Sequence, residues 1–273
     1  MSALDLIADW PVRNAAAAVV NPSGVLAERG DTAHRFALAS VTKPLVARAV
    51  QVAVEEGVLE LDTPAGPPES TVRHLLAHTS GYAMHNDEVM SPPGKRRIYS
   101  NYGFGVAADA VAKKADIDFG RYLSEAVFEP LAMADSDLEG GAKAAGYGVT
   151  STVADLVNFA ADLLRPALVS SEMHDLATAV QFPGLNGVLP GFGSQRPNDW
   201  GLGFEIRDDK SPHWTGSANS GRTYGHFGQS GTFIWVDPDR ELALVALTDR
   251  DFGDWASERW PAVSDAVIAE FDS

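Results

Sequence analysis

The sequence predicts an α+β fold, in which an antiparallel β-sheet is flanked by N- and C-terminal helices and a mostly helical segment is inserted beside it. Strand-like segments occur in two groups, one near each end of the chain. The first group comprises residues 15–20, 24–30 and 34–40, and the second comprises residues 200–207, 223–229, 232–237 and 241–249. The simplest packing joins both groups in one sheet with the terminal helices on it.

Two helices are expected within the first 60 residues. Residues 3–10 predict a short amphipathic helix, and the apolar residues of 42–56 recur at helical period. Pro44 fits the first turn of the second helix, where a missing N–H matters least. Gly57 supplies its C-terminal stop. We therefore expect this helix to begin near Ser40.

Two stretches rich in proline and glycine, 61–70 and 182–199, predict connections between units. Residues 71–180 between them are expected to be mostly helical, and residues 256–271 predict a closing helix. The length of 273 residues is consistent with about two units. We expect a discontinuous sheet domain, an inserted helical domain and an active site in the cleft between them, with the boundaries 1–60 plus 190–273 for the first and 61–189 for the second.

Composition excludes several classes of protein. The chain has no cysteine, which excludes disulfides, thiol nucleophiles and cysteine-ligated zinc. A net charge of −16 disfavours nucleic acid and anionic membrane surfaces, and the Lys95-Arg96-Arg97 run is short. No segment approaches the ~18 apolar residues of a membrane span, and the first residues lack the pattern of a secretory signal. We expect a cytoplasmic protein with no nucleic-acid or membrane partner, and the oligomeric state stays open.

Ser40 and Lys43 form the one Ser-x-x-Lys pattern of the chain, at the start of a predicted helix. Residues three apart in a first helical turn project on the same side. A serine hydroxyl becomes a nucleophile when a base takes its proton. Lysine can be that base if desolvation lowers its pKa. The alternative is that Ser40 caps the helix while Lys43 is exposed.

Tyr99-Ser100-Asn101 is the one Tyr-x-Asn in the sequence. Alternation in a short loop would point Tyr99 and Asn101 the same way. A phenol beside a lysine can relay a proton, and an asparagine amide can bind a substrate amide. A packed tyrosine and a turn asparagine are the structural alternative.

The segment His226-Phe227-Gly228 lies on or beside a predicted strand. A glycine there would let a substrate approach the strand backbone. The N–H of Gln229, with that of Ser40, could form an oxyanion hole. The alternative is a packing glycine and a partly buried histidine.

Taken in this order, the three patterns resemble the motifs of the penicillin-recognising serine hydrolases, the superfamily of β-lactamases, D,D-peptidases and related esterases. The Tyr-x-Asn form resembles the class C β-lactamase branch. The resemblance implies a β-lactamase/transpeptidase-like fold and hydrolysis through an acyl-enzyme. It implies these roles: Ser40 as nucleophile, Lys43 and Tyr99 as base and proton relay, Asn101 as acyl-group ligand, and the Ser40 and Gln229 amides as oxyanion donors.

Two departures from this family narrow the expected substrate. His226 stands where β-lactamases usually carry lysine, and a mostly neutral imidazole attracts a β-lactam carboxylate less than an ammonium does. An export signal is also missing from the sequence. We expect a carboxylesterase, or an amidase or D-aminopeptidase related to β-lactamases, acting on a small ester or amide. A true β-lactamase or D,D-peptidase is one alternative, and a non-catalytic penicillin-binding-like homologue is another.

Other hydrolytic chemistries have weaker support. His74 and His78 have the four-residue spacing of a helical zinc site, with His85 and Asp87 nearby, but the glutamate of a His-Glu-x-x-His motif is absent. The chain also contains no Gly-x-Ser-x-Gly elbow of an α/β-hydrolase. We therefore expect neither a metal nor another cofactor.

Overall fold

The protein is built on a six-stranded antiparallel sheet, seen here in a computed structural model that describes residues 2–272. The strand order is β2-β1-β11-β10-β9-β8. The strands are β1 (Ala15–Asn21), β2 (Gly24–Arg29), β8 (Glu205–Ile206), β9 (Tyr224–Gly228), β10 (Thr232–Asp237) and β11 (Leu242–Thr248). Because β1 pairs with β11, the two ends of the chain share one sheet, as the sequence predicts.

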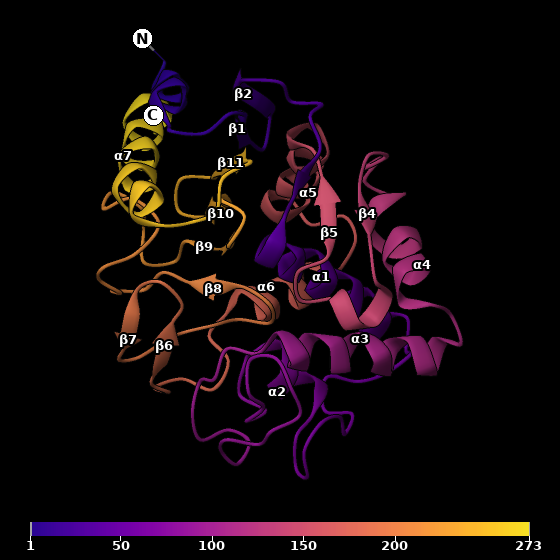
Figure 1. The fold of residues 1–273 in the computed structure, drawn as a ribbon. Helices are drawn as coiled ribbons and strands as arrows, with labels where there is room; N and C mark the ends of the chain where they lie inside the picture. The colour runs from indigo at the N-terminus through magenta and orange to yellow at the C-terminus, as the bar shows by residue number, and fades with distance from the viewer. Residues whose placement is uncertain (1, 273) are drawn as a thin grey trace.

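Each face of the sheet carries its own helices (Figure 1). The 3₁₀ helix η1 (Ala3–Asp9) and helix α7 (Asp254–Phe271) cover one face, where Trp235 and Trp260 are buried. Helices α1 (Thr42–Glu55) and α5 (Val153–Leu164) belong to the apolar core on the other face. Alternate side chains of β1, β10 and β11 enter the two cores, which is the period-two pattern of a sheet buried on both sides.

Helix α1 begins at Thr42, where its apolar pattern begins and two residues after Ser40, near which its start is expected. A 3₁₀ turn, η2 (Ala39–Val41), precedes it and contains Ser40. The C-terminus has the expected glycine stop: Gly57 adopts a positive φ of 75°, and the N–H of Val58 bonds to the carbonyl of Ala53. Ser40 therefore does not cap this helix, whose first turn carries no side-chain cap.

The middle of the chain combines helices with short strands. The helices are α2 (Val72–Leu76), α3 (Asn101–Ala115), α4 (Phe119–Leu123), the π-helical η3 (Ser124–Phe128), η4 (Gly141–Ala144) and α6 (Ser171–Thr178). A small sheet has the order β3-β5-β4, and a hairpin joins β6 to β7. These strands are β3 (Phe36–Ala37), β4 (Asp137–Leu138), β5 (Val149–Ser151), β6 (Gly187–Leu189) and β7 (Gly193–Gln195).

Several expected elements differ in detail. The segment 34–40 contributes only β3, which pairs with β5 outside the main sheet. The segment 200–207 contributes only the two residues of β8, and the stretch 182–199 forms the β6–β7 hairpin as well as connections. The N-terminal helix is a 3₁₀ helix. The domain boundaries at 60 and 190 stay a prediction.

A helix that crosses a membrane must be long and apolar. Within residues 2–272, none combines the length and the apolar character that crossing a membrane requires.

Candidate active site

Ser40 lies in the η2 turn, immediately before the long buried helix α1. The residue before it, Ala39, has a positive φ of 45°, a conformation that residues with a Cβ adopt at an energetic cost. Lys43 follows in the first turn of α1, so its side chain returns toward the Ser40 hydroxyl. The distance between Lys43 Nζ and Ser40 Oγ is 3.1 Å.

The Lys43 amine is completely buried and has no carboxylate partner among residues 2–272. Burial lowers its pKa well below the usual value. Nζ also lies 2.6 Å from Asn101 Oδ1 and 2.7 Å from the carbonyl oxygen of Gly146. Both oxygens only accept hydrogen bonds. Ser40 Oγ is a third acceptor within reach of an ammonium at Nζ. Once the amine is neutral and gives its two hydrogens to the other two oxygens, its lone pair points at Ser40 Oγ, as a general base requires.

Tyr99 approaches Ser40 from the other side. Its hydroxyl lies 2.7 Å from Ser40 Oγ, and burial raises the pKa of the phenol, so Tyr99 is protonated in the resting protein. The loop is fixed just after it: Ser100 caps helix α3 by accepting the N–H of Gly103 and donates to the carbonyl of Ala83. This cap places Asn101 in the first turn of α3, facing Lys43.

His226, on β9, lies next to Tyr99, with 3.4 Å between Nε2 and the phenol oxygen. Its Nδ1 lies 2.7 Å from the carbonyl oxygen of Phe227, so Nδ1 carries the proton and Nε2 has a free lone pair. Burial is the main cause that lowers the pKa of His226 to about 3. The imidazole is therefore neutral and offers no charge to a substrate carboxylate.

The end of β9 packs tightly against the segment before Ser40. A Cβ on Gly228 would lie 2.2 Å from the carbonyl oxygen of Leu38. Gly228 does not line the cavity at Ser40, so the structure favours the packing interpretation over direct substrate contact. The next residue, Gln229, does line it and is held by the N–H of Phe252, which donates to the Gln229 carbonyl at 2.7 Å.

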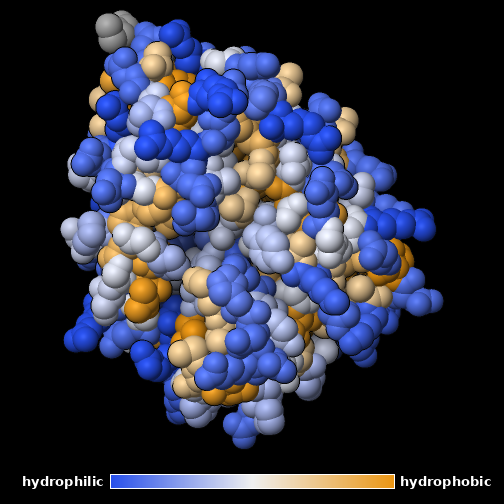
Figure 2. Space-filling model, in the orientation of Figure 1, coloured by the Kyte–Doolittle hydropathy of each residue, from blue (hydrophilic) through white to orange (hydrophobic). Residues whose placement is uncertain are grey.

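A cavity of about 90 Å³ opens beside Ser40. Its walls comprise Ser40, Met84, Tyr99, Leu189, Pro190, Trp200, Glu205, His226, Phe227 and Gln229. Larger hollows of about 640 and 320 Å³ contain none of the residues predicted from the three motifs. Figure 2 shows a recess near the middle of this face, in the region where Figure 1 places β8 and β9. The motif residues that touch the cavity are thus Ser40, Tyr99, His226 and Gln229.

Comparison with known proteins gives the family. A sequence model of the family described as "Beta-lactamase" matches residues 9–267. The chain belongs to the β-lactamase family. This confirms the superfamily that the three motifs predict.

Three solved structures have a similar fold. A β-lactamase from Mycobacterium bovis is 69% identical, with a TM-score of 0.99 over 100% of both chains. A mutant of simvastatin synthase from Aspergillus terreus has a TM-score of 0.80 at 16% identity, covering 98% of this chain and 93% of that one. EstCE1, described as a hydrolase with promiscuous acyltransferase activity, has a TM-score of 0.79 at 16% identity, covering 97% of this chain and 96% of that one. No curated protein matches the chain.

In this member of the β-lactamase family, His78 supports the tyrosine loop. Its ring packs at a tilt against Tyr99 with 4.5 Å between centroids, and its Nδ1 accepts the N–H of Ser100 at 3.1 Å. His74 instead contacts Thr71 through Nδ1 at 2.9 Å. No group of three or more potential metal ligands was found within residues 2–272.

Sequence reasoning missed two further contributors to the site. Gly146 accepts from Lys43 through its carbonyl oxygen, a group that every residue type carries, so its sequence gave no signal. Glu205, on β8, is a buried carboxylate in the cavity wall. The only feature of the sequence that could indicate a role for Glu205 is that a charged residue stands within a predicted strand.

Proposed function

We propose that this β-lactamase-family chain is a serine hydrolase that acts on a small ester or amide through an acyl-enzyme, with Ser40 as the nucleophile. The observation that carries the proposal is the position of Ser40 Oγ. It lies between a buried amine at 3.1 Å and a phenol at 2.7 Å, at the wall of a cavity. Few structural roles require a lysine without a counter-ion at such a place, because an uncompensated buried charge is costly.

Acylation begins when Lys43 takes the Ser40 proton. Oγ attacks the substrate carbonyl carbon, and the C=O electron pair moves to oxygen. The N–H groups of Ser40 and Gln229 would hold this oxyanion. The N–H of Ser40 lies in the first turn of a 3₁₀ helix, where helical partners are missing. Each oxyanion donor contributes roughly 10²–10³ to the rate.

The collapse of the tetrahedral intermediate needs a proton on the leaving group. Tyr99 is the candidate donor, because its raised pKa keeps the hydroxyl protonated at rest and that hydroxyl is close to Ser40. His226 Nε2 can accept a hydrogen bond from the phenol when Tyr99 turns away from Ser40. Water then attacks the acyl-enzyme, and the same groups transfer the protons in the reverse direction, which restores the Ser40 hydroxyl. Asn101 is proposed to have two roles: it is a hydrogen-bond partner of Lys43, and it binds an amide of the substrate's acyl group.

The neutral His226 favours esterase or amidase activity over the hydrolysis of anionic β-lactams. A β-lactamase is the second candidate, favoured by the 69% identical protein from Mycobacterium bovis that is described as one. D,D-peptidase activity and a non-catalytic, penicillin-binding-like role are further alternatives. The cytoplasmic location stays a prediction.

A substrate panel tests this proposal. Short-chain p-nitrophenyl esters, D-amino-acid amides and a chromogenic cephalosporin are assayed with wild type and Ser40→Ala. We expect ester turnover that Ser40→Ala abolishes, with unchanged thermal unfolding. A serine-directed phosphonate should label Ser40 of the folded wild type. Turnover by Ser40→Ala refutes the nucleophile, and a lack of both turnover and labelling favours the binding homologue.

A further inference from the structure

The cavity beside Ser40 has aromatic and apolar walls and one ionised side chain. Tyr99, Trp200 and Phe227 supply aromatic rings. Tyr99 and His226 are neutral, because burial raises the pKa of the phenol and lowers that of the imidazole. Glu205 is the one lining side chain that carries a full charge. Burial alone would raise the pKa of Glu205, but His213 and Lys210 outweigh it and bring the pKa to about 2.

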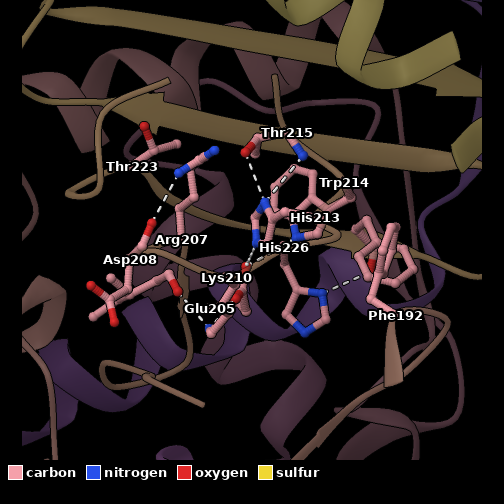
Figure 3. Close-up of polar contacts among 12 residues, drawn as sticks. Phe192, Glu205, Arg207, Asp208, Lys210, His213, Trp214, Thr215, Thr223 and His226 are labelled. Carbon is pink, nitrogen blue, oxygen red and sulfur yellow. Dashed lines mark hydrogen bonds and ion pairs between the residues drawn. The ribbon is translucent and has the colours of Figure 1, made fainter. Parts of the chain in front are cut away.

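Three side chains contact the two oxygens of the Glu205 carboxylate (Figure 3). Lys210 forms an ion pair with Oε1, while His213 Nε2 and Trp214 Nε1 lie 2.8 and 3.0 Å from Oε2. His213 Nδ1 accepts the N–H of Thr215 at 3.2 Å, so Nε2 is the nitrogen that donates to Glu205. None of these three partners lines the cavity. Glu205 is thus the charged residue of the cavity wall, and its cationic partner Lys210 lies outside that wall.

Such a cluster needs an explanation other than stability. Glu205 is only 2% exposed, and a buried ion pair is generally no more stabilising than apolar residues of the same volume. A carboxylate beside aromatic rings is, however, the combination that binds an ammonium group, through charge and through the faces of the rings. A substrate carboxylate in the same place would be repelled.

We propose that this cavity binds a protonated amine of the substrate and that Glu205 is the residue that selects it. This inference rests on the proposed function and narrows its substrate class to esters or amides of small amino acids. The cavity beside Ser40 is small, about 90 Å³, which favours a short amino-acyl group such as glycyl or alanyl.

A matched pair of substrates tests the selection. Glycine p-nitroanilide and propionic acid p-nitroanilide have acyl groups of equal length that differ in an ammonium against a methyl group. At about pH 6.5 the α-amine is protonated. We expect wild type to have a kcat/KM at least about tenfold higher for the glycyl substrate, and Glu205→Gln to reduce this ratio to about one. The control Glu258→Gln, an exposed carboxylate on α7, should keep the wild-type ratio. A wild type without the preference, or a Glu205→Gln variant that retains it, overturns the inference.

A second variant and a binding measurement separate the possible failures. If Glu205→Gln does not fold, because Lys210 loses its partner, the combination with Lys210→Met removes both charges and should also lose the preference. Binding of glycinamide and propionamide to Ser40→Ala, followed by NMR titration, needs no turnover. Tighter binding of glycinamide supports the inference even if wild type hydrolyses no substrate. The lack of hydrolysis would then contradict only the proposed function. Equal binding overturns the inference even if esters are hydrolysed.

Discussion

Gly228 allows a direct test of the site geometry, because it joins strand β9 to the turn that carries Ser40. In Gly228→Ala, the new methyl carbon would lie 2.2 Å from the Leu38 carbonyl oxygen and 2.4 Å from Thr232 Oγ1. Thr232 Oγ1 already donates to this oxygen at 2.8 Å, so neither neighbour can turn away freely. Cβ contacts under 3.0 Å are essentially never observed. The strand and the turn must therefore separate by roughly 1 Å, since packed interiors transmit such strain.

The expected loss of activity exceeds the loss of stability. Overpacking of this kind lowers the free energy of unfolding by about 1–3 kcal/mol, which leaves most of a typical protein folded. A displacement of about 1 Å between the Ser40 turn and the Gln229 amide, however, can lower kcat about 10²-fold. Ester hydrolysis and thermal unfolding are measured together, with Gly221→Ala as the control, since its Cβ would meet no atom closer than 3.7 Å. A Gly228→Ala protein with wild-type kcat would refute this account of the glycine.

Three further predictions concern the proton transfers. Lys43→Met should lower kcat/KM by about 10²–10⁴-fold. Burial gives Lys43 a lower pKa in the folded than in the unfolded protein, so between these two pKa values the unfolded chain binds more protons. The free energy of unfolding therefore rises with pH in this range, by up to about 1.4 kcal/mol per pH unit. Denaturant unfolding should show a shallower rise in Lys43→Met, and equal slopes would contradict the buried neutral amine. Tyr99→Phe should slow acylation by about 10²-fold or more in single-turnover kinetics, and a wild-type rate would exclude the relay. The decrease of kcat/KM at low pH should be unchanged in His226→Gln, since a pKa of about 3 keeps His226 neutral over the pH range of that decrease. If the decrease disappears in His226→Gln, protonation of His226 is its cause.

The features that the sequence predicts correctly depend on local pattern. Helix α1 follows from its apolar period and from Gly57, and the central sheet follows from long apolar strands with a clear hairpin turn. The family follows from three short motifs in the right order, and comparison confirms it. The structure brings Ser40, Lys43 and Tyr99 together, although their catalytic roles stay predictions.

The features that the sequence does not predict depend on distant contacts or on the backbone. Strand β3 has two residues, and its pairing with β5 has no signal at that length. Gly146 contributes a carbonyl oxygen, which no pattern distinguishes from any other. Glu205 becomes a cavity carboxylate only because Lys210 and His213 fold back onto it, and the position of those side chains cannot be inferred from periodicity.

The charge state of the resting site links these observations. In the proposed resting state Lys43 is neutral, Tyr99 is protonated and the imidazoles of His78 and His226 are neutral, so none of these four side chains carries a charge beside Ser40. In the proposed acylation step, a positive charge forms on Lys43 as a negative charge forms on the substrate oxygen. Both charges arise in a buried region, where their mutual attraction is much stronger than in water. The rings of Tyr99 and Phe104, with centroids 4.5 and 5.5 Å from Nζ, favour the new ammonium as well. In this proposal, the burial that lowers the pKa of the amine also strengthens the attraction between the two charges in the transition state.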